Sequence, residues 1–176
     1  MRKTLVLAAI LIACAAAGAA AQQGVLGFWQ TIDDETGRAK SVVALYTYQD
    51  KLYGRVILSY EDDGVTVRDD IHRGQRRSPF LVGDPAFCGL DIIWDLKLDS
   101  GGRWKGGSIM DPGDQEKKPK VYGAEIWRQG DDLIVRGKIA FLGRNQTWKP
   151  FRASSFPAAF GVPDTASFRP TIPRIK

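Results

Sequence analysis

The chain has 176 residues, 44% of them hydrophobic, and a formal net charge of +5 at pH 7. That length and apolar content suffice for one domain with a sizeable core. The charge is too small for the dense basic stripe of a nucleic-acid-binding protein, so we expect no nucleic-acid partner.

Residues 1–21 have the pattern of a secretory signal peptide. Arg2 and Lys3 precede an apolar run from Leu5 to Ala17, and three small residues, Ala19–Ala21, precede Gln22. The run is too short and too rich in Ala to span a bilayer as a stable helix. We expect cleavage before Gln22, which leaves 155 residues and lowers the net charge to +3, because both removed charges are basic. The mature protein is then periplasmic or secreted.

A competing signal lies inside this segment. Leu11-Ile12-Ala13-Cys14 resembles the bacterial lipoprotein box, in which the Cys is lipidated and anchors the protein to a membrane. The sequence favours soluble export, because an ordinary cleavage site follows. Contact with a membrane is expected only if Cys14 is lipidated.

Cleavage before Gln22 leaves Cys88 as the only cysteine. One cysteine cannot form an internal disulfide, so the fold must depend on its core. We interpret Cys88 as a small buried residue entering a strand. A reactive thiol and an intermolecular bridge are the alternatives.

The rest of the chain is typical of an antiparallel β-protein. Short runs rich in Val, Ile, Tyr and Trp are separated by Gly- and Asp-rich turns, and Leu133, Val135, Gly137 and Ile139 alternate onto one face. Eight consecutive strands with short turns predict an eight-stranded antiparallel up-and-down barrel, a closed form that has no exposed edges. The predicted strands are Val25–Ile32, Lys40–Tyr48, Lys51–Tyr60, Leu90–Leu98, Arg103–Ile109, Lys120–Arg128, Asp132–Ile139 and Arg144–Arg152.

Two segments do not fit the strand pattern. Residues 61–89 form a long polar loop, and such loops are usually lids, binding loops or disordered. Residues 153–176 are rich in Pro and lack periodicity, which predicts an extended or disordered tail. The barrel domain is therefore placed at residues 22–152.

Several motifs resemble those of the bacterial family known as domain of unknown function 2147, and they cover roughly residues 24–150. They are Gly27-Phe28-Trp29, Leu52-Tyr53-Gly54-Arg55-Val56, Cys88-Gly89-Leu90, Trp104-x-Gly106-Gly107-x-Ile109-x-Asp111-Pro112, Val135-Arg136-Gly137 and Gly143-Arg144-x-Gln146-Thr147-Trp148. The chain departs from the family at Met110, at Asn145 and in its longer turn 114–119. Gly27-x-Trp29 is also similar to the start of lipocalin-type barrels, where the Trp plugs the closed end. The resemblance implies an exported lipocalin-like barrel and carries no established activity.

The sequence offers little for catalysis or metal binding. His72 is the only histidine, which excludes a site with two His ligands. The acidic clusters at 33–35 and 61–63 lack the spacing of a calcium loop and are typical of turns. We expect no catalytic residue, no metal and no cofactor.

A barrel of this size holds one small ligand or is filled by its own side chains. Our candidates for the lining are Trp94, Tyr122, Trp127 and Arg136. Arg136 would point inward, either to stack on Trp29 or to bind an anionic ligand, and Arg144 and Arg152 compete for the stacking position.

The leading hypothesis is a non-catalytic binding protein for a small apolar or amphipathic molecule. The alternative is an envelope-associated interaction protein with a filled barrel, acting through the basic residues of loop 61–89, which are Arg68, Arg73, Arg76 and Arg77. An enzyme is the least favoured third hypothesis, because no nucleophile–base pair is visible. The sequence leaves the oligomeric state open.

Overall fold

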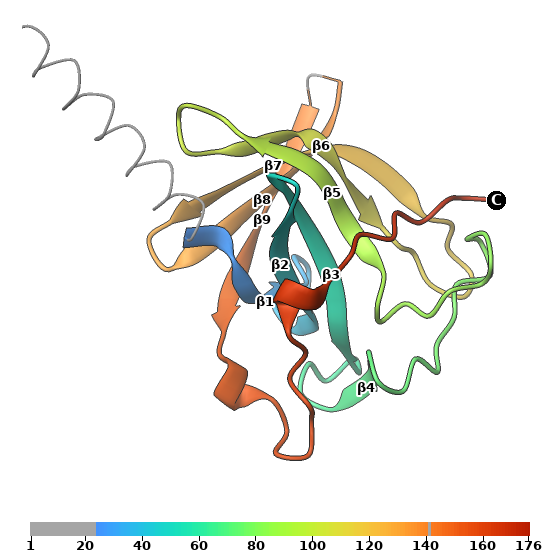
Figure 1. The fold of residues 1–176 in the computed structure, drawn as a ribbon. Helices are drawn as coiled ribbons and strands as arrows, with labels where there is room; N and C mark the ends of the chain where they lie inside the picture. Colours follow the sequence, from blue (N-terminus) through green and yellow to red (C-terminus); the bar gives the residue numbers. More distant parts are fainter. Residues whose placement is uncertain (1–23, 141) are drawn as a thin grey trace, which may run out of the picture.

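The computed structural model describes residues 24–140 and 142–176, so the expected signal peptide lies outside the described residues. Figure 1 shows strands wrapped around a common axis. They are β1 (Gly27–Ile32), β2 (Ala39–Tyr48), β3 (Lys51–Tyr60), β4 (Val67–Asp70), β5 (Asp91–Leu98), β6 (Trp104–Asp111), β7 (Lys120–Gln129), β8 (Asp132–Ile139) and β9 (Leu142–Phe151), followed by the 3-10 turns η1 (Ala153–Ser155) and η2 (Thr165–Ser167). No helix in the described ranges is long and apolar enough to cross a membrane.

Eight of these strands close into an antiparallel barrel. Hydrogen bonding runs β1-β2-β3-β5-β6-β7-β8-β9, and β9 pairs again with β1. The predicted fold class is therefore confirmed, and the ends of the eight predicted strands are off by two residues or fewer. The sequence did not predict β4, a short strand of loop 61–89 that pairs antiparallel with the end of β3, because its residues are mostly charged.

The interior of the barrel is packed solid at one end, which we call the closed end. This is the end where β1 begins and where the β2–β3 and β5–β6 turns lie. At Gly54 an added Cβ would lie 2.9 Å from the Leu45 side chain and 3.0 Å from that of Ile93, so no larger residue fits there. The buried side chains that fill this half are Trp29, Val43, Leu45, Leu52, Ile93, Leu96, Trp104, Ile126, Leu133, Val135 and Trp148.

Trp29, for which the sequence predicted a plug, is buried in this half of the barrel. Its Nε1 donates a hydrogen bond to the carbonyl oxygen of Val25 at 2.8 Å. The guanidinium of Arg128 lies 4.9 Å from the centre of the indole ring. The cation on Trp29 is thus Arg128, and the expectation that Arg136, Arg144 or Arg152 would stack there is wrong.

The C-terminal tail covers the outside of the barrel. Residues 153–176 run extended across it, as the red segment in Figure 1 shows, and Phe156 and Phe168 are buried. Phe156 makes edge contacts with Phe28 of β1 and Phe151 of β9, and Phe168 does so with Tyr46 of β2. These aromatic rings form a second core outside the barrel, so the tail is part of the folded domain.

A fully buried carboxylate fastens the tail. Asp91 of β5 accepts hydrogen bonds from the Tyr46 hydroxyl at 2.9 Å and from Nε and Nη2 of Arg55 at 3.1 and 2.6 Å. It also accepts the backbone N–H of Thr171 at 2.6 Å, and Arg55 donates to the carbonyl oxygen of Arg169. A buried charge left unpaired is costly, so this network favours the docked tail.

Replacing Trp29→Ala should lower the free energy of unfolding by about 3–5 kcal/mol, because it leaves a large cavity in a closely packed core. Urea denaturation of the purified protein measures this loss. Arg128→Ala removes the cation on Trp29 and the hydrogen bonds from Arg128 to the carbonyl oxygen of Gly130 but leaves the core packing intact, so it should cost less, about 1–2 kcal/mol. Equal losses for the two variants would contradict the packing described above.

Candidate functional site

Two of the predicted lining residues, Trp94 and Trp127, lie on the outside of the barrel. The cross-strand partner of Trp94 is Ser108, whereas the neighbouring pair Ile93 and Ile109 faces inward. Trp94 is half-buried and also packs against the outer core. On β7 the inner position belongs to Ile126, and the outward Trp127 stacks under the guanidinium of Arg103 at 4.4 Å.

Arg136 also lies outside, because Leu133 and Val135 take the inner positions of β8. It stands opposite Glu125, whose carboxylate binds Lys138 and Arg103. The hydrogen bond from Lys138 is the main reason why the pKa of Glu125 lies below its usual value, and Arg103 adds to this effect. The prediction that Trp94, Trp127 and Arg136 line the interior is therefore wrong. The two-residue alternation along β8 was predicted correctly. The face that carries Arg136 was assigned to the barrel interior, whereas the face that carries Leu133 and Val135 lies there.

The basic loop carries less free charge than its sequence suggests. Arg68 is paired with Glu61 and Asp62, and Arg73 with Asp70. Arg76 lies over the ring of Phe87, and the Arg77 Nε donates to the carbonyl oxygen of Asp84. The predicted basic patch of Arg68, Arg73, Arg76 and Arg77 is thus half neutralised by acidic groups of the same loop.

His72 and Cys88 are held in structural contacts. His72 Nε2 lies 2.7 Å from the carbonyl oxygen of Gly161, and its ring packs on Phe160, so it fastens the tail. Cys88 is buried beside Ser59, and burial raises the pKa of its thiol to about 12. The thiolate required of a nucleophile is therefore absent at neutral pH. In residues 24–140 and 142–176 no three His, Cys, Asp or Glu side chains are grouped to hold a metal ion.

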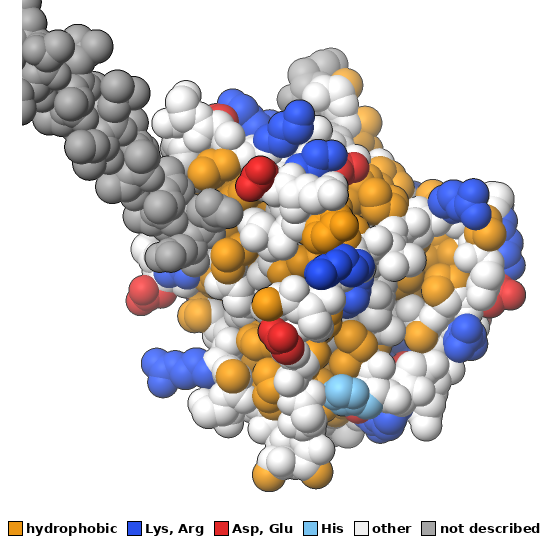
Figure 2. All heavy atoms as spheres, viewed as in Figure 1, with side chains coloured by type: hydrophobic (Ala, Val, Ile, Leu, Met, Phe, Trp, Pro, Cys, Tyr) orange, Lys and Arg blue, Asp and Glu red, His pale blue; other side chains and the backbone are white. Residues whose placement is uncertain are grey.

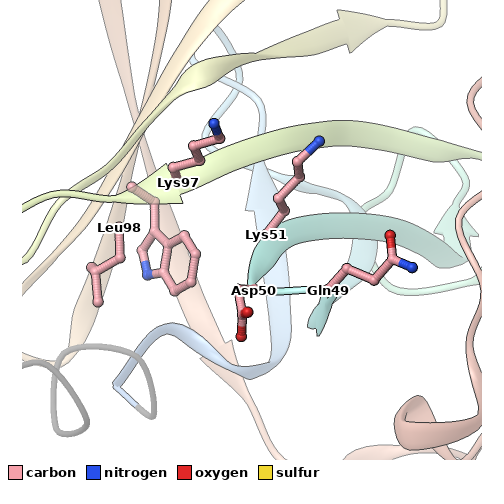
Figure 3. A pocket seen from close by; sticks show the side chains of 6 residues that line it. Gln49, Asp50, Lys51, Lys97 and Leu98 are labelled. Atoms are coloured by element: carbon pink, nitrogen blue, oxygen red, sulfur yellow. The ribbon is translucent and has the colours of Figure 1, made fainter.

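A shallow depression of about 350 Å³ lies at the closed end, beside the β2–β3 turn. Figure 3 shows Lys51 and Lys97 projecting from neighbouring strands in one direction and the Asp50 carboxylate pointing another way. Lys51 is already paired with Asp95 at 2.7 Å. The polar groups of this depression do not converge, so it is a poor candidate for a ligand site.

The inner face of the barrel changes character toward its other end, which we call the mouth. Trp148 is the last fully buried ring, and its Nε1 donates to Oε1 of Gln146 at 3.3 Å. Beyond it, the buried Val56, Ala124 and Val135 give way to inward-facing residues that are only half-buried, so solvent reaches the latter. These residues are Thr31, Ser41, Ser59, Ile109, Tyr122 and Gln146.

One side of the mouth is polar. The hydroxyls of Thr31 and Ser41 lie 2.8 Å apart on β1 and β2, and Ser59 follows on β3. Gln146 reaches Asp34, which also forms an ion pair with Arg144 at 2.9 Å. Hydroxyl and amide groups therefore line the wall formed by β1, β2, β3 and β9.

The opposite side is apolar. Tyr122, the one predicted lining residue that faces inward, stands opposite Ile109 and beside Gly137. The same inner face of β8 and β9 continues past the barrel to Ile139 and Leu142, which are cross-strand partners and are 63% and 67% exposed. Such exposure of inward-facing aliphatic residues is unusual and marks a candidate binding surface. The alternation along β8 already contained Ile139, but the sequence could not show that the strand extends beyond the rim.

The mouth combines convergent polar groups with an exposed apolar wall, and we take it as the candidate functional site. No curated protein matches the chain. The solved structure of protein HP1028 from the human pathogen Helicobacter pylori, described as belonging to the lipocalin family, is similar over 74% of this chain and 84% of that chain, with a TM-score of 0.54 and 18% identity. This likeness shows the fold. The model of a family of uncharacterised proteins conserved in bacteria, DUF2147, matches residues 27–150. Because that match covers more than half of its length, the chain belongs to the DUF2147 family.

Proposed function

We propose that the protein is a non-catalytic binding protein that takes a small amphipathic molecule at the mouth of its barrel. The observation that carries this proposal is the change along the inner face, from fully buried apolar side chains to half-buried polar and apolar ones. Lipocalin barrels of eight strands hold one small ligand. Here the closed half is filled, so the ligand would lie in the outer half only.

The two walls of the mouth suggest how the ligand is oriented. Its apolar part would cover Ile139, Leu142 and the ring of Tyr122, which are exposed to water without it. Its polar end would bind the hydroxyls of Thr31 and Ser41 or the amide of Gln146. An amphipathic molecule satisfies both walls, whereas a purely apolar one would leave these polar groups unpaired.

The contacts of Cys88 and His72 support a binding role over catalysis. Cys88 is protonated and His72 is bound to the tail. The alternative, an interaction protein acting through loop 61–89, is less favoured because Arg68 and Arg73 are already ion-paired.

The double substitution Ile139→Ser and Leu142→Ser should weaken the binding of an amphipathic dye by about tenfold or more, because two aliphatic contacts are lost. Wild-type affinity is expected to be micromolar or weaker. Dye fluorescence titration measures both values. The matched control is Val162→Ser, which removes a 43% exposed aliphatic side chain from the C-terminal tail, outside the barrel. If the mouth variant and the control bind the dye equally, the mouth is not the site.

We also propose that the protein is exported and begins at Gln22, from the charged start, apolar run and small residues of segment 1–21. Intact-mass measurement of the protein from its native host should give the mass of residues 22–176. A mass that fits an acylated chain starting at Cys14 would instead establish a lipid-anchored protein.

A further inference from the structure

A second cavity lies outside the barrel, between loop 82–90 and the C-terminal tail. Its volume is about 520 Å³, within the range of small-molecule sites. Its lining includes Arg55, Val82, Leu90, Ile172, Pro173 and Arg174, none of which belongs to the mouth. We call this cavity the outer groove.

The walls of the outer groove are fixed by hydrogen bonds. On the barrel side, Val56 donates to the carbonyl oxygen of Leu90 at 2.9 Å and accepts from Gly89 at 2.8 Å. On the tail side, Thr171 is held by Asp91, and Val82 donates to the carbonyl oxygen of Arg174 at 2.8 Å. Segments far apart in the sequence are thus held together before any ligand arrives, which lowers the entropic cost of binding.

The chemistry of the groove is that of an anion site with apolar sides. Asp91 binds Nε and Nη2 of Arg55 and neutralises one positive charge. The guanidinium of Arg174 has neither an ion pair nor a hydrogen bond within the described ranges, so one positive charge of the groove is uncompensated. Val82 and Ile172 beside it are large exposed aliphatic residues. In Figure 2, basic and hydrophobic side chains stand next to one another around the place where Figure 1 marks the C-terminus.

We propose that the outer groove binds a small amphipathic anion, whose acidic group pairs with Arg174 beside Arg55 and whose apolar part lies on Val82 and Ile172. We expect an anion because the positive charge of Arg174 needs an acidic partner. The buried acid of this network, Asp91, cannot supply it, since it already accepts hydrogen bonds from Arg55, Tyr46 and Thr171. The site shares no lining residue with the mouth, although Cys88 of the groove lies beside Ser59 of the mouth.

Calorimetric titration of the full mature protein with octanoate tests the proposal, with octanol as the uncharged analogue. Arg174→Gln should weaken octanoate binding about tenfold and leave octanol binding unchanged, because only a charge-assisted contact is lost. Ile172→Ser should weaken both. The matched control is Arg152→Gln, which removes an exposed Arg that immediately precedes the tail and lies outside the groove, and it should change neither. Arg174 is exposed, so the thermal melting of its variant should equal that of the wild type.

A second arm separates this site from the mouth. The double variant Ile139→Ser and Leu142→Ser should retain the Arg174-dependent octanoate binding even if it loses the dye. Octyl phosphate in place of octanoate shows which acidic group is preferred, and tighter binding of either through Arg174 supports the proposal. The proposal would be overturned if neither octanoate nor octyl phosphate bound at millimolar concentrations. It would also be overturned if Arg174→Gln left their binding intact.

Discussion

The packing of three indole rings in the closed half of the barrel is the constraint on which the rest of this structure depends. Trp29, Trp104 and Trp148 are all buried there and fill an interior that eight strands make only wide enough for side chains or one small ligand. Protein interiors are packed as densely as organic crystals, so the closed half of the barrel has no room for a ligand. A ligand of this protein would therefore have to bind at the mouth or on the outer surface.

The outer surface is shaped by the tail as much as by the barrel. The outer faces of β2 and β3 carry Tyr46, Tyr53 and Ile57, which would be an exposed apolar patch without the tail. Phe156 and Phe168 cover this patch. Hydrophobic burial is non-directional, so the hydrogen bonds of the Asp91 network are what fix the position of the tail on the barrel. The outer groove exists only because the tail is docked, since residues 171–174 form one of its walls.

Local ion pairs determine where charge remains available. Arg68, Arg73, Arg103 and Lys138 all meet a carboxylate on a neighbouring turn or strand. Exposed pairs of this kind contribute little to stability, but they remove the positive potential that a count of basic residues suggests. Among the described residues Arg174 has no such partner, and neither have Arg76 and Arg77 of the basic loop. Arg174 differs from those two because it lines the outer groove.

The sequence by itself determined the strands, their order and the closed barrel, because two-residue alternation and Gly- or Asp-rich turns are local signals. It also singled out Trp29 and Tyr122. It did not determine which face of each strand points inward, because turning a strand over exchanges every side chain between the two faces without altering the pattern. For that reason Trp127 and Arg136 were assigned to the interior, and Arg128 was missed as the cation on Trp29. The docking of the tail and the outer groove were decided only by tertiary structure, since they join residues such as Asp91 and Thr171 that no local pattern connects.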